Sequence, residues 1–264
     1  MAQLLRGVAY ITGAGSGIGQ HTAFSFARHG VKRMALIDFK PENLHRTVDE
    51  LKKQAPDVEV LPIECNTANE KAVFDSVAET VKRFGSLDYA VNNAGRGGPA
   101  KPTHELESKD WQSLIDVNLT GVWYCQKAQI QQMLKQEPKN DREGRGSIVN
   151  VASMLGTKAS APSTFATDYT ATKHGVMGLT KADAIFYGRP EYRIRINAMC
   201  PGYVATPLLL AAREAGVMDG EVAKVPMGRM AMMEEIGDAI TFLSSPLASY
   251  MCGQGLVVDG GYCA

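Results

Sequence analysis

The sequence lacks an excess of charge of either sign. Its 264 residues include 28 lysines and arginines and 28 aspartates and glutamates, so the formal net charge is zero. A protein that binds nucleic acid needs a basic surface field to hold the phosphate backbone. We therefore expect a small-molecule substrate and no nucleic-acid partner.

Long apolar runs are also missing. No stretch reaches the roughly 18 apolar residues that a membrane-spanning helix needs, so we expect no membrane segment. The first residues, MAQLLRGVAYITGAG, contain only a short apolar run, which leads directly into a glycine-rich turn. That pattern is unlike a secretory signal and predicts a cytoplasmic protein.

Cysteine and histidine are sparse, with five of each. The cysteines show no CxxC pair and lie far apart, which is typical of reduced thiols in a cytosolic protein. The histidines lack ligand spacing, so we expect no metal site. The five cysteines are Cys65, Cys125, Cys200, Cys252 and Cys263.

What the sequence does contain is a regular alternation of apolar, β-branched runs with longer amphipathic stretches. This order predicts parallel β-α-β units with right-handed crossovers. We expect one domain over residues 1–264, an α/β Rossmann-type doubly wound parallel sheet of about seven strands with helices on both faces. The expected strands are 7–13, 33–38, 58–65, 87–93, 147–153, 193–200 and 255–260, and the expected helices are 17–30, 41–55, 68–84, 108–136, 167–187 and 234–244.

Two segments qualify this pattern. Pro62 weakens the third strand, because proline has no N–H to donate within a sheet. The polar stretch EPKNDREGRG at 137–146 is expected to be a surface loop before the fifth strand.

A glycine-rich turn, TGAGSGIG at 12–19, lies between the first strand and the first helix. The spacing G-x-G-x-x-G fails here, but G-x-x-x-G-x-G fits Gly13, Gly17 and Gly19. Residues without side chains let the backbone approach a pyrophosphate, and the helix N-terminus supplies N–H donors. A P-loop is excluded because no Lys-Ser/Thr pair follows. The alternative is a tight turn that binds nothing.

Asp38 ends the second strand about 20 residues beyond the glycines, where an acidic side chain accepts hydrogen bonds from the ribose of a dinucleotide. It would repel a 2′-phosphate, so NAD is expected and NADP is less favoured. The alternative is that Asp38 only caps the helix that begins near Pro41. Phe39 and Ser16 add no positive charge, although Lys40 could reach a phosphate.

Six motifs in order give the chain a resemblance to classical short-chain dehydrogenases/reductases over nearly its whole length. They are TGAGSGIG (12–19), NNAG (92–95), Asn118 in DVNLTG, Ser153 in NVAS, YTATK (169–173), and PG (201–202) followed by Thr206. The resemblance implies hydride transfer between a nicotinamide cofactor and an alcohol or ketone. Family members are commonly homotetramers, so a homotetramer or homodimer is expected.

The resemblance also implies which residues form the site. Asn118, Ser153, Tyr169 and Lys173 would be the catalytic tetrad, with the backbone of Asn118 holding a water molecule that links Lys173 to solvent. The NNAG segment would lie beside adenine and stabilise the central sheet, and Asn66 stands where the family often has an aspartate. The implied cofactor-binding residues are Gly13, Ser16, Gly17, Ile18, Gly19, Asp38, Asn66, Asn92, Ala94, Gly95, Tyr169, Lys173, Pro201, Gly202, Val204 and Thr206.

Residue chemistry supports the tetrad. Tyr169 and Lys173 are four apart on a predicted helix and share a face. A nearby ammonium favours the phenolate, so we expect a lowered pKa for Tyr169, which would then exchange a proton with the substrate oxygen. Ser153 would hydrogen-bond the same oxygen. His174 points to a different face and is expected to be structural.

The interval of 16 positions from Ser153 to Tyr169 is longer than is usual in the family. The additional residues fall in the irregular segment MLGTKASAPSTFATD. They could loop out without moving either residue, or they could reshape the mouth of the pocket.

The segment after PG, about 203–230, is expected to be a lid over the substrate, and its apolar residues favour a lipophilic secondary alcohol or ketone. They could instead pack the lid on the body or on a neighbouring subunit. The apolar end, GLVVDGGYCA, suits an interface or a pocket wall. A non-redox enzyme or a cofactor-binding regulatory protein on the same fold is the alternative function. The lid residues in question are Leu208, Leu209, Leu210, Val217, Met218, Val225 and Met227, with charges at Arg213, Glu214, Asp219, Glu221 and Lys224.

Overall fold

The computed structural model describes residues 3–207, 209–210 and 218–264. Within them, seven parallel strands form one sheet in the order β3-β2-β1-β4-β5-β6-β7, so the predicted doubly wound α/β fold is confirmed. From β1 the chain adds β2 and β3 on one side of the sheet and then β4 to β7 on the other side, so the topological switch point lies between β1 and β4. The strands are β1 (Val8–Thr12), β2 (Arg33–Asp38), β3 (Glu59–Glu64), β4 (Tyr89–Asn92), β5 (Gly146–Val151), β6 (Ile194–Pro201) and β7 (Gly255–Val258).

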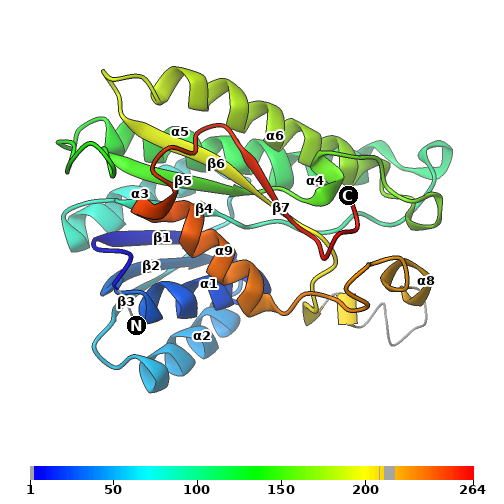
Figure 1. Cartoon of the computed structure of the whole chain (residues 1–264), viewed down its shortest axis with the longest axis horizontal. Helices are drawn as coiled ribbons and strands as arrows, with labels where there is room; N and C mark the ends of the chain where they lie inside the picture. Colours follow the sequence, from blue (N-terminus) through cyan, green and yellow to red (C-terminus); the bar gives the residue numbers. More distant parts are fainter. Residues whose placement is uncertain (1–2, 208, 211–217) are drawn as a thin grey trace.

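Helices cover both faces of the sheet (Figure 1). One apolar core joins the sheet to α1, α2 and α9, and a second joins its other face to α3, α5 and α6. The helices are α1 (Gly17–Arg28), α2 (Pro41–Gln54), α3 (Glu70–Phe84), α4 (Ser108–Ile115), α5 (Gly121–Met133), α6 (Thr167–Tyr187), α8 (Asp219–Val222) and α9 (Met233–Ser244).

The third strand forms despite Pro62, because β3 is the edge of the sheet. Pro62 pairs in register with Leu36 of β2, and β3 has no strand on its other side. An edge strand tolerates a proline because a missing N–H can fall on its unpaired side.

The single helix expected at 108–136 is divided. α4 ends at Ile115, a π-helical turn covers Asp116–Thr120, and α5 follows from Gly121. The axis continues through the turn in right-handed helical backbone, so apolar periodicity does not reveal the change. Such π turns are frequent at functional sites, and this one contains Asn118.

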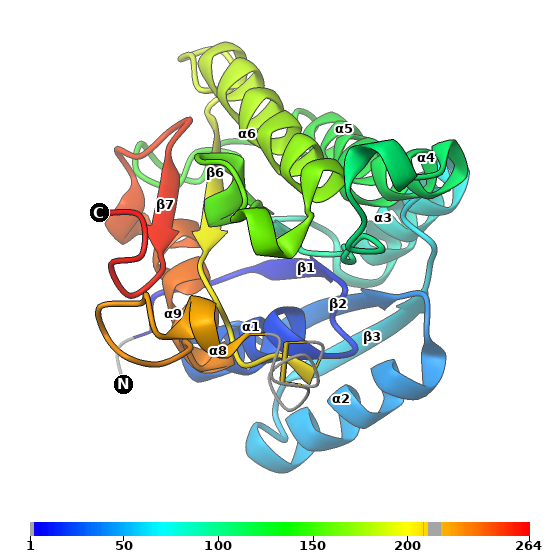
Figure 2. The same ribbon diagram turned by 90° about the vertical axis from the view of Figure 1, so that its right-hand side faces the viewer.

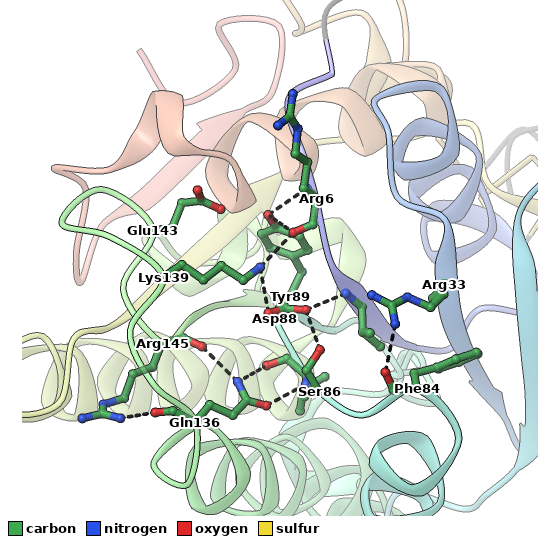
Figure 3. Close-up of polar contacts among 12 residues, drawn as sticks. Arg6, Arg33, Phe84, Ser86, Asp88, Tyr89, Gln136, Lys139, Glu143 and Arg145 are labelled. Carbon is green, nitrogen blue, oxygen red and sulfur yellow. Dashed lines mark hydrogen bonds and ion pairs between the residues drawn. The ribbon is translucent and has the colours of Figure 1, made fainter.

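A buried carboxylate ties together the amino ends of β1 and β4 (Figure 3). Asp88 is 4% exposed. It accepts a hydrogen bond from the N–H of Val8 at 2.6 Å and from the hydroxyl of Ser86 at 2.9 Å, and it pairs with Lys139 at 2.8 Å. Lys139 belongs to the polar stretch 137–146, a loop exposed at residues 139–142 as expected, and its ion pair joins this loop to the sheet.

Candidate active site

A cavity of about 850 Å³ lies at the carboxyl ends of β1, β4, β5 and β6, where the strand order reverses. Open α/β sheets bind ligands at this point. Figure 2 shows the molecule from the side on which α8 lies, and Met218, the residue before α8, lines the cavity. Of the predicted site residues, those on the cavity wall are Gly13, Ser16, Gly17, Ile18, Asp38, Asn66, Ala94, Gly95, Ser153, Tyr169, Lys173, Pro201, Gly202, Val204 and Thr206; Gly19, Asn92 and Asn118 are not on it.

The glycine turn joins β1 to α1 along one side of the cavity. Gly13 and Gly17 have φ of +64° and +59°, which favour glycine. A Cβ on Gly19 would overlap the carbonyl of Gly13, so Gly19 allows the close packing of the turn. Because Ser16, Gly17 and Ile18 line the cavity where α1 begins, the unpaired N–H groups of the first turn suit a pyrophosphate.

Asp38 reaches back to the glycine turn. Its carboxylate accepts a hydrogen bond from the N–H of Gly15 at 2.9 Å and another from the N–H of Lys40 at 3.0 Å. Lys40 is the residue before α2, so Asp38 does help to begin that helix. It also lines the cavity, where the carboxylate can accept further hydrogen bonds.

Ser153, Tyr169 and Lys173 meet on the opposite side of the cavity, from the end of β5 and the first turns of α6. The side chain of Ser153 lies close enough to the Tyr169 hydroxyl to lower its pKa. The Nζ atom of Lys173 lies 5.4 Å from the centre of the Tyr169 ring and donates to the carbonyl of Val151 at 2.8 Å. The phenol of Tyr169, the hydroxyl of Ser153 and the ammonium of Lys173 therefore lie close together.

Burial sets the pKa values of this group. It raises the pKa of Tyr169 to about 12, against a smaller lowering by the hydrogen bond to Ser153. The expected lowering of the Tyr169 pKa is therefore wrong, because desolvation outweighs the lowering by Ser153. Burial also lowers the pKa of Lys173 to about 8, opposed by Cys200.

Comparison with known proteins agrees with this geometry. The family model described as enoyl-(acyl carrier protein) reductase matches residues 13–263. The chain belongs to the short-chain dehydrogenase/reductase family. Short-chain dehydrogenase anuF of Penicillium roqueforti is 38% identical, covering 99% of this chain and 97% of that protein. Cyclohexanol dehydrogenase of an Acinetobacter species is 39% identical, covering 97% and 94%.

Solved structures agree with the sequence relatives. The crystal structure of levodione reductase has a TM-score of 0.88 and 33% identity, and the match covers 97% of this chain and 96% of that one. The relatives are dehydrogenases and reductases, and the family binds nicotinamide cofactors. This chain is thus an oxidoreductase of the short-chain family.

The two asparagines in the NNAG segment of this short-chain dehydrogenase/reductase have different contacts. Asn92 is 1% exposed and its amide bonds Gln129 and Asn150, so its side chain serves the sheet. Asn93 takes the expected place on the cavity wall and donates to the carbonyls of Thr12 and Gly13, both at 3.1 Å. Neighbouring strand residues face opposite sides, and this period of two was the signal that could have found Asn93.

Asn118 is fully buried, and its side chain holds the loop after β4. Its Oδ1 accepts a hydrogen bond from the N–H of Arg96 at 2.9 Å, and its Nδ2 donates to the carbonyl of Arg96 at 2.8 Å. Val117, its neighbour in the π turn, lines the cavity. This contact with Arg96 adds a loop-positioning role that the sequence did not indicate.

The long interval between Ser153 and Tyr169 forms part of the cavity wall. It contains two short 3-10 turns, Met154–Gly156 and Pro162–Thr164. Leu155, Ala161 and Phe165 of this segment line the cavity. The additional residues therefore shape the pocket, and both Ser153 and Tyr169 still line it.

The expected lid is described only in part. Leu208, Arg213, Glu214 and Val217 lie outside the described residues. Leu209 and Met218 line the cavity, and Met218 packs with Val222 and Met230 in a small apolar cluster.

The C-terminal tail contacts this lid. Tyr262 donates its hydroxyl to Glu221 of α8 at 2.6 Å, and its ring packs edge-on against Tyr203 with 5.2 Å between centroids. Tyr203 lines the cavity, so the C-terminal tail packs against a residue of the cavity wall.

The side chain of His174 lies apart from Ser153, Tyr169 and Lys173. His174 is exposed and bonds the carbonyl of Thr170 at 3.0 Å, away from Tyr169. In the part of the chain that the structure describes, no cluster of His, Cys, Asp and Glu could hold a metal ion. Across the same residues, no helix is long and apolar enough to cross a membrane.

Proposed function

We propose that the chain transfers hydride between NAD(H) and a lipophilic, neutral secondary alcohol or ketone. The observation that carries the proposal is one cavity whose wall contains the glycine turn and Asp38 on one side and Ser153, Tyr169 and Lys173 on the other. A dinucleotide along the first side would bring its nicotinamide end toward the second.

The residues divide the proton chemistry among them. When bound, the nicotinamide cofactor supplies or accepts the hydride. Tyr169 takes the hydroxyl proton of an alcohol, or returns a proton to a carbonyl oxygen. Ser153 donates a hydrogen bond to that oxygen and holds it beside Tyr169. Lys173, fixed by Val151, supplies positive charge that stabilises the phenolate.

Asp38 supports the choice of NAD. Its carboxylate lines the cavity and would repel a 2′-phosphate, while it accepts hydrogen bonds from ribose hydroxyls. The ammonium of Lys40 lies 5.4 Å from the centre of the Phe39 ring, in a cation–π contact with its own neighbour. Comparing kcat/KM for NAD⁺ and NADP⁺ with one alcohol tests this choice, and an advantage for NADP⁺ would refute it.

The wall beyond Tyr169 supports a lipophilic substrate. Leu155, Phe165, Leu209 and Met218 present apolar side chains there. Arg96 is the arginine on the described wall, and its guanidinium donates to Ser113 at 2.7 Å. No arginine cluster marks a carboxylate or phosphate site among the described lining residues.

A substrate panel tests the proposal. The purified protein is incubated with NAD⁺ and cyclohexanol, a long-chain secondary alcohol, a sugar phosphate or a small hydroxy acid, and reduced nicotinamide is followed by absorbance. The name of the relative cyclohexanol dehydrogenase makes the cyclic alcohol the first choice. Faster turnover of the phosphate or the hydroxy acid would refute the substrate class. NAD⁺ binding without any turnover would favour the regulatory alternative.

We also propose that the chain forms a homodimer or homotetramer. Large apolar side chains are exposed on α4, α5 and α6, among them Trp111, Trp123 and Ile185, the last at 78% exposure. Such a surface is typical of a protein interface. Light scattering of the purified protein tests this, and a monomer at micromolar concentration would contradict it.

A further inference from the structure

Asp168 is a carboxylate in the cavity wall with one oxygen that nothing in the described structure satisfies. It lies in the first turn of α6, directly before Tyr169, and is 2% exposed. Its Oδ1 accepts a hydrogen bond from the N–H of Tyr169 at 2.7 Å. Its Oδ2 is buried and has no hydrogen-bond partner among the described residues.

The opposite side of this carboxylate is a glycine loop. A Cβ on Gly98 would overlap Oδ2 of Asp168, so the absence of a side chain at 98 leaves room for the carboxylate. Gly97, Gly98 and Ala100 line the cavity beside it. The surroundings of Oδ2 are thus backbone and small side chains.

The cations on the described wall have other partners. The guanidinium of Arg96 is bonded to Ser113, and the ammonium of Lys173 is bonded to the carbonyl of Val151. Lys40 lies beside Asp38 at the far side, over the Phe39 ring. In the described part of the chain, no ion pair neutralises Asp168.

A buried carboxylate oxygen without a hydrogen-bond donor destabilises the folded chain unless a ligand supplies the donor. Buried polar oxygens are nearly always hydrogen-bonded, and a buried charge without a partner is unfavourable. One carboxylate oxygen of Asp168 accepts a hydrogen bond from the N–H of Tyr169 at the start of α6. The side-chain oxygen of an asparagine could accept the same bond. The second oxygen has no role in the helix and lies against Gly98; since the side chain lines the cavity, a shift of this glycine loop lets a bound ligand bring it a donor.

We propose that Asp168 is a specificity subsite that accepts a hydrogen bond from a second donor group of the substrate, a hydroxyl on a carbon other than the reacting one. The inference rests on the proposed function of the same cavity and narrows its substrate class. The substrate is then an apolar ring or chain that carries one reacting alcohol or ketone and one further O–H.

Asp168→Asn is the matched variant. Its amide oxygen keeps the bond from the N–H of Tyr169, and its NH₂ group replaces the acceptor Oδ2 with a donor. Volume and shape are retained, so the fold of α6 is preserved. Asp141→Asn is the control, because it makes the same chemical change at a side chain that is 95% exposed.

The experiment compares cyclohexanol with cyclohexane-1,3-diol, cyclohexane-1,4-diol and 4-aminocyclohexanol, each with NAD⁺. We expect the protein to favour one of the diols over cyclohexanol by about tenfold or more in kcat/KM, mainly through KM, as a hydrogen bond to a charged acceptor provides. Asp168→Asn should bring that ratio close to one, and Asp141→Asn should leave it unchanged. Preference for the amine over both diols would assign the subsite to an ammonium donor and overturn the assignment to a hydroxyl.

Binding separates this inference from the proposed function. Calorimetric titration of the diols into Tyr169→Phe, with and without Asp168→Asn, requires no turnover. Weaker diol binding in the double variant supports the subsite even if no alcohol is oxidised. Turnover of cyclohexanol and the diols at equal kcat/KM, or an unchanged ratio in Asp168→Asn, would overturn the subsite and leave the oxidoreductase function standing.

Discussion

The ammonium of Lys173 lies 5.4 Å from the centre of the Tyr169 ring and is anchored to the carbonyl of Val151 at 2.8 Å. The two residues are four apart on α6, so they lie on one face of the helix. Val151, whose carbonyl holds the ammonium, is the last residue of β5. Because Lys173 is only 4% exposed, solvent screens its charge little. This pair is the centre of the proposed chemistry.

Tyr169→Phe should abolish turnover while leaving cofactor binding nearly intact. The ring still fills its space, but the hydroxyl that moves the proton is gone, and general acid–base catalysis contributes about 10²–10⁴-fold. Steady-state absorbance gives kcat, and fluorescence titration with NADH gives the dissociation constant. A variant that keeps a tenth of the original kcat would show that another group moves the proton.

Lys173→Ala should lower kcat and also weaken cofactor binding. The change removes the charge beside Tyr169 and leaves the carbonyl of Val151 without its partner. The same two measurements apply, with Lys181→Ala, on the same helix, as the control. An unchanged NADH dissociation constant would remove Lys173 from the cofactor site.

The rate of ketone reduction should fall as pH rises through about 8. Burial lowers the pKa of Lys173 to about 8, so the ammonium is present below that pH and is lost above it. Without that charge, the phenolate left when Tyr169 gives its proton is less stable. A profile of kcat/KM from pH 6 to 10 tests this, and a rate that rises across pH 8 would contradict it.

Asp38→Ala should reduce the preference for NAD⁺. The variant removes the charge that repels a 2′-phosphate and the acceptor for ribose. The ratio of kcat/KM for NAD⁺ to that for NADP⁺ should fall, and thermal stability should decrease because Gly15 and Lys40 lose a bond. An unchanged ratio would mean that other residues select the cofactor.

Asp88→Ala should destabilise the fold by about 2–4 kcal/mol, because it leaves the N–H of Val8 without its partner and removes the carboxylate that pairs with Lys139 (Figure 3). Lys139→Ala should cost less, because its side chain is 36% exposed. Urea unfolding measures both. Because this contact lies at the amino ends of the strands, kcat of the folded protein should change little; equal stability of Asp88→Ala and the unchanged protein would contradict the prediction.

The fold class could be predicted from the sequence, because alternating strand and helix periods and the turn at 12–19 are local patterns. Strands expected at 33–38 and 58–65 lie at Arg33–Asp38 and Glu59–Glu64. Motif order also indicated Ser153, Tyr169 and Lys173, which the fold brings to one cavity.

The contacts of the polar side chains depend on packing between distant segments and could not be predicted from the sequence. Asn118 bonds a loop 22 positions away, and Asn92 bonds Gln129 and Asn150 across the sheet, which no local pattern reveals. Burial, not the neighbouring lysine, sets the direction of the Tyr169 pKa, and burial leaves one oxygen of Asp168 without a partner. Solvent exclusion depends on what packs around a side chain, and the packing here comes from segments far apart in the chain.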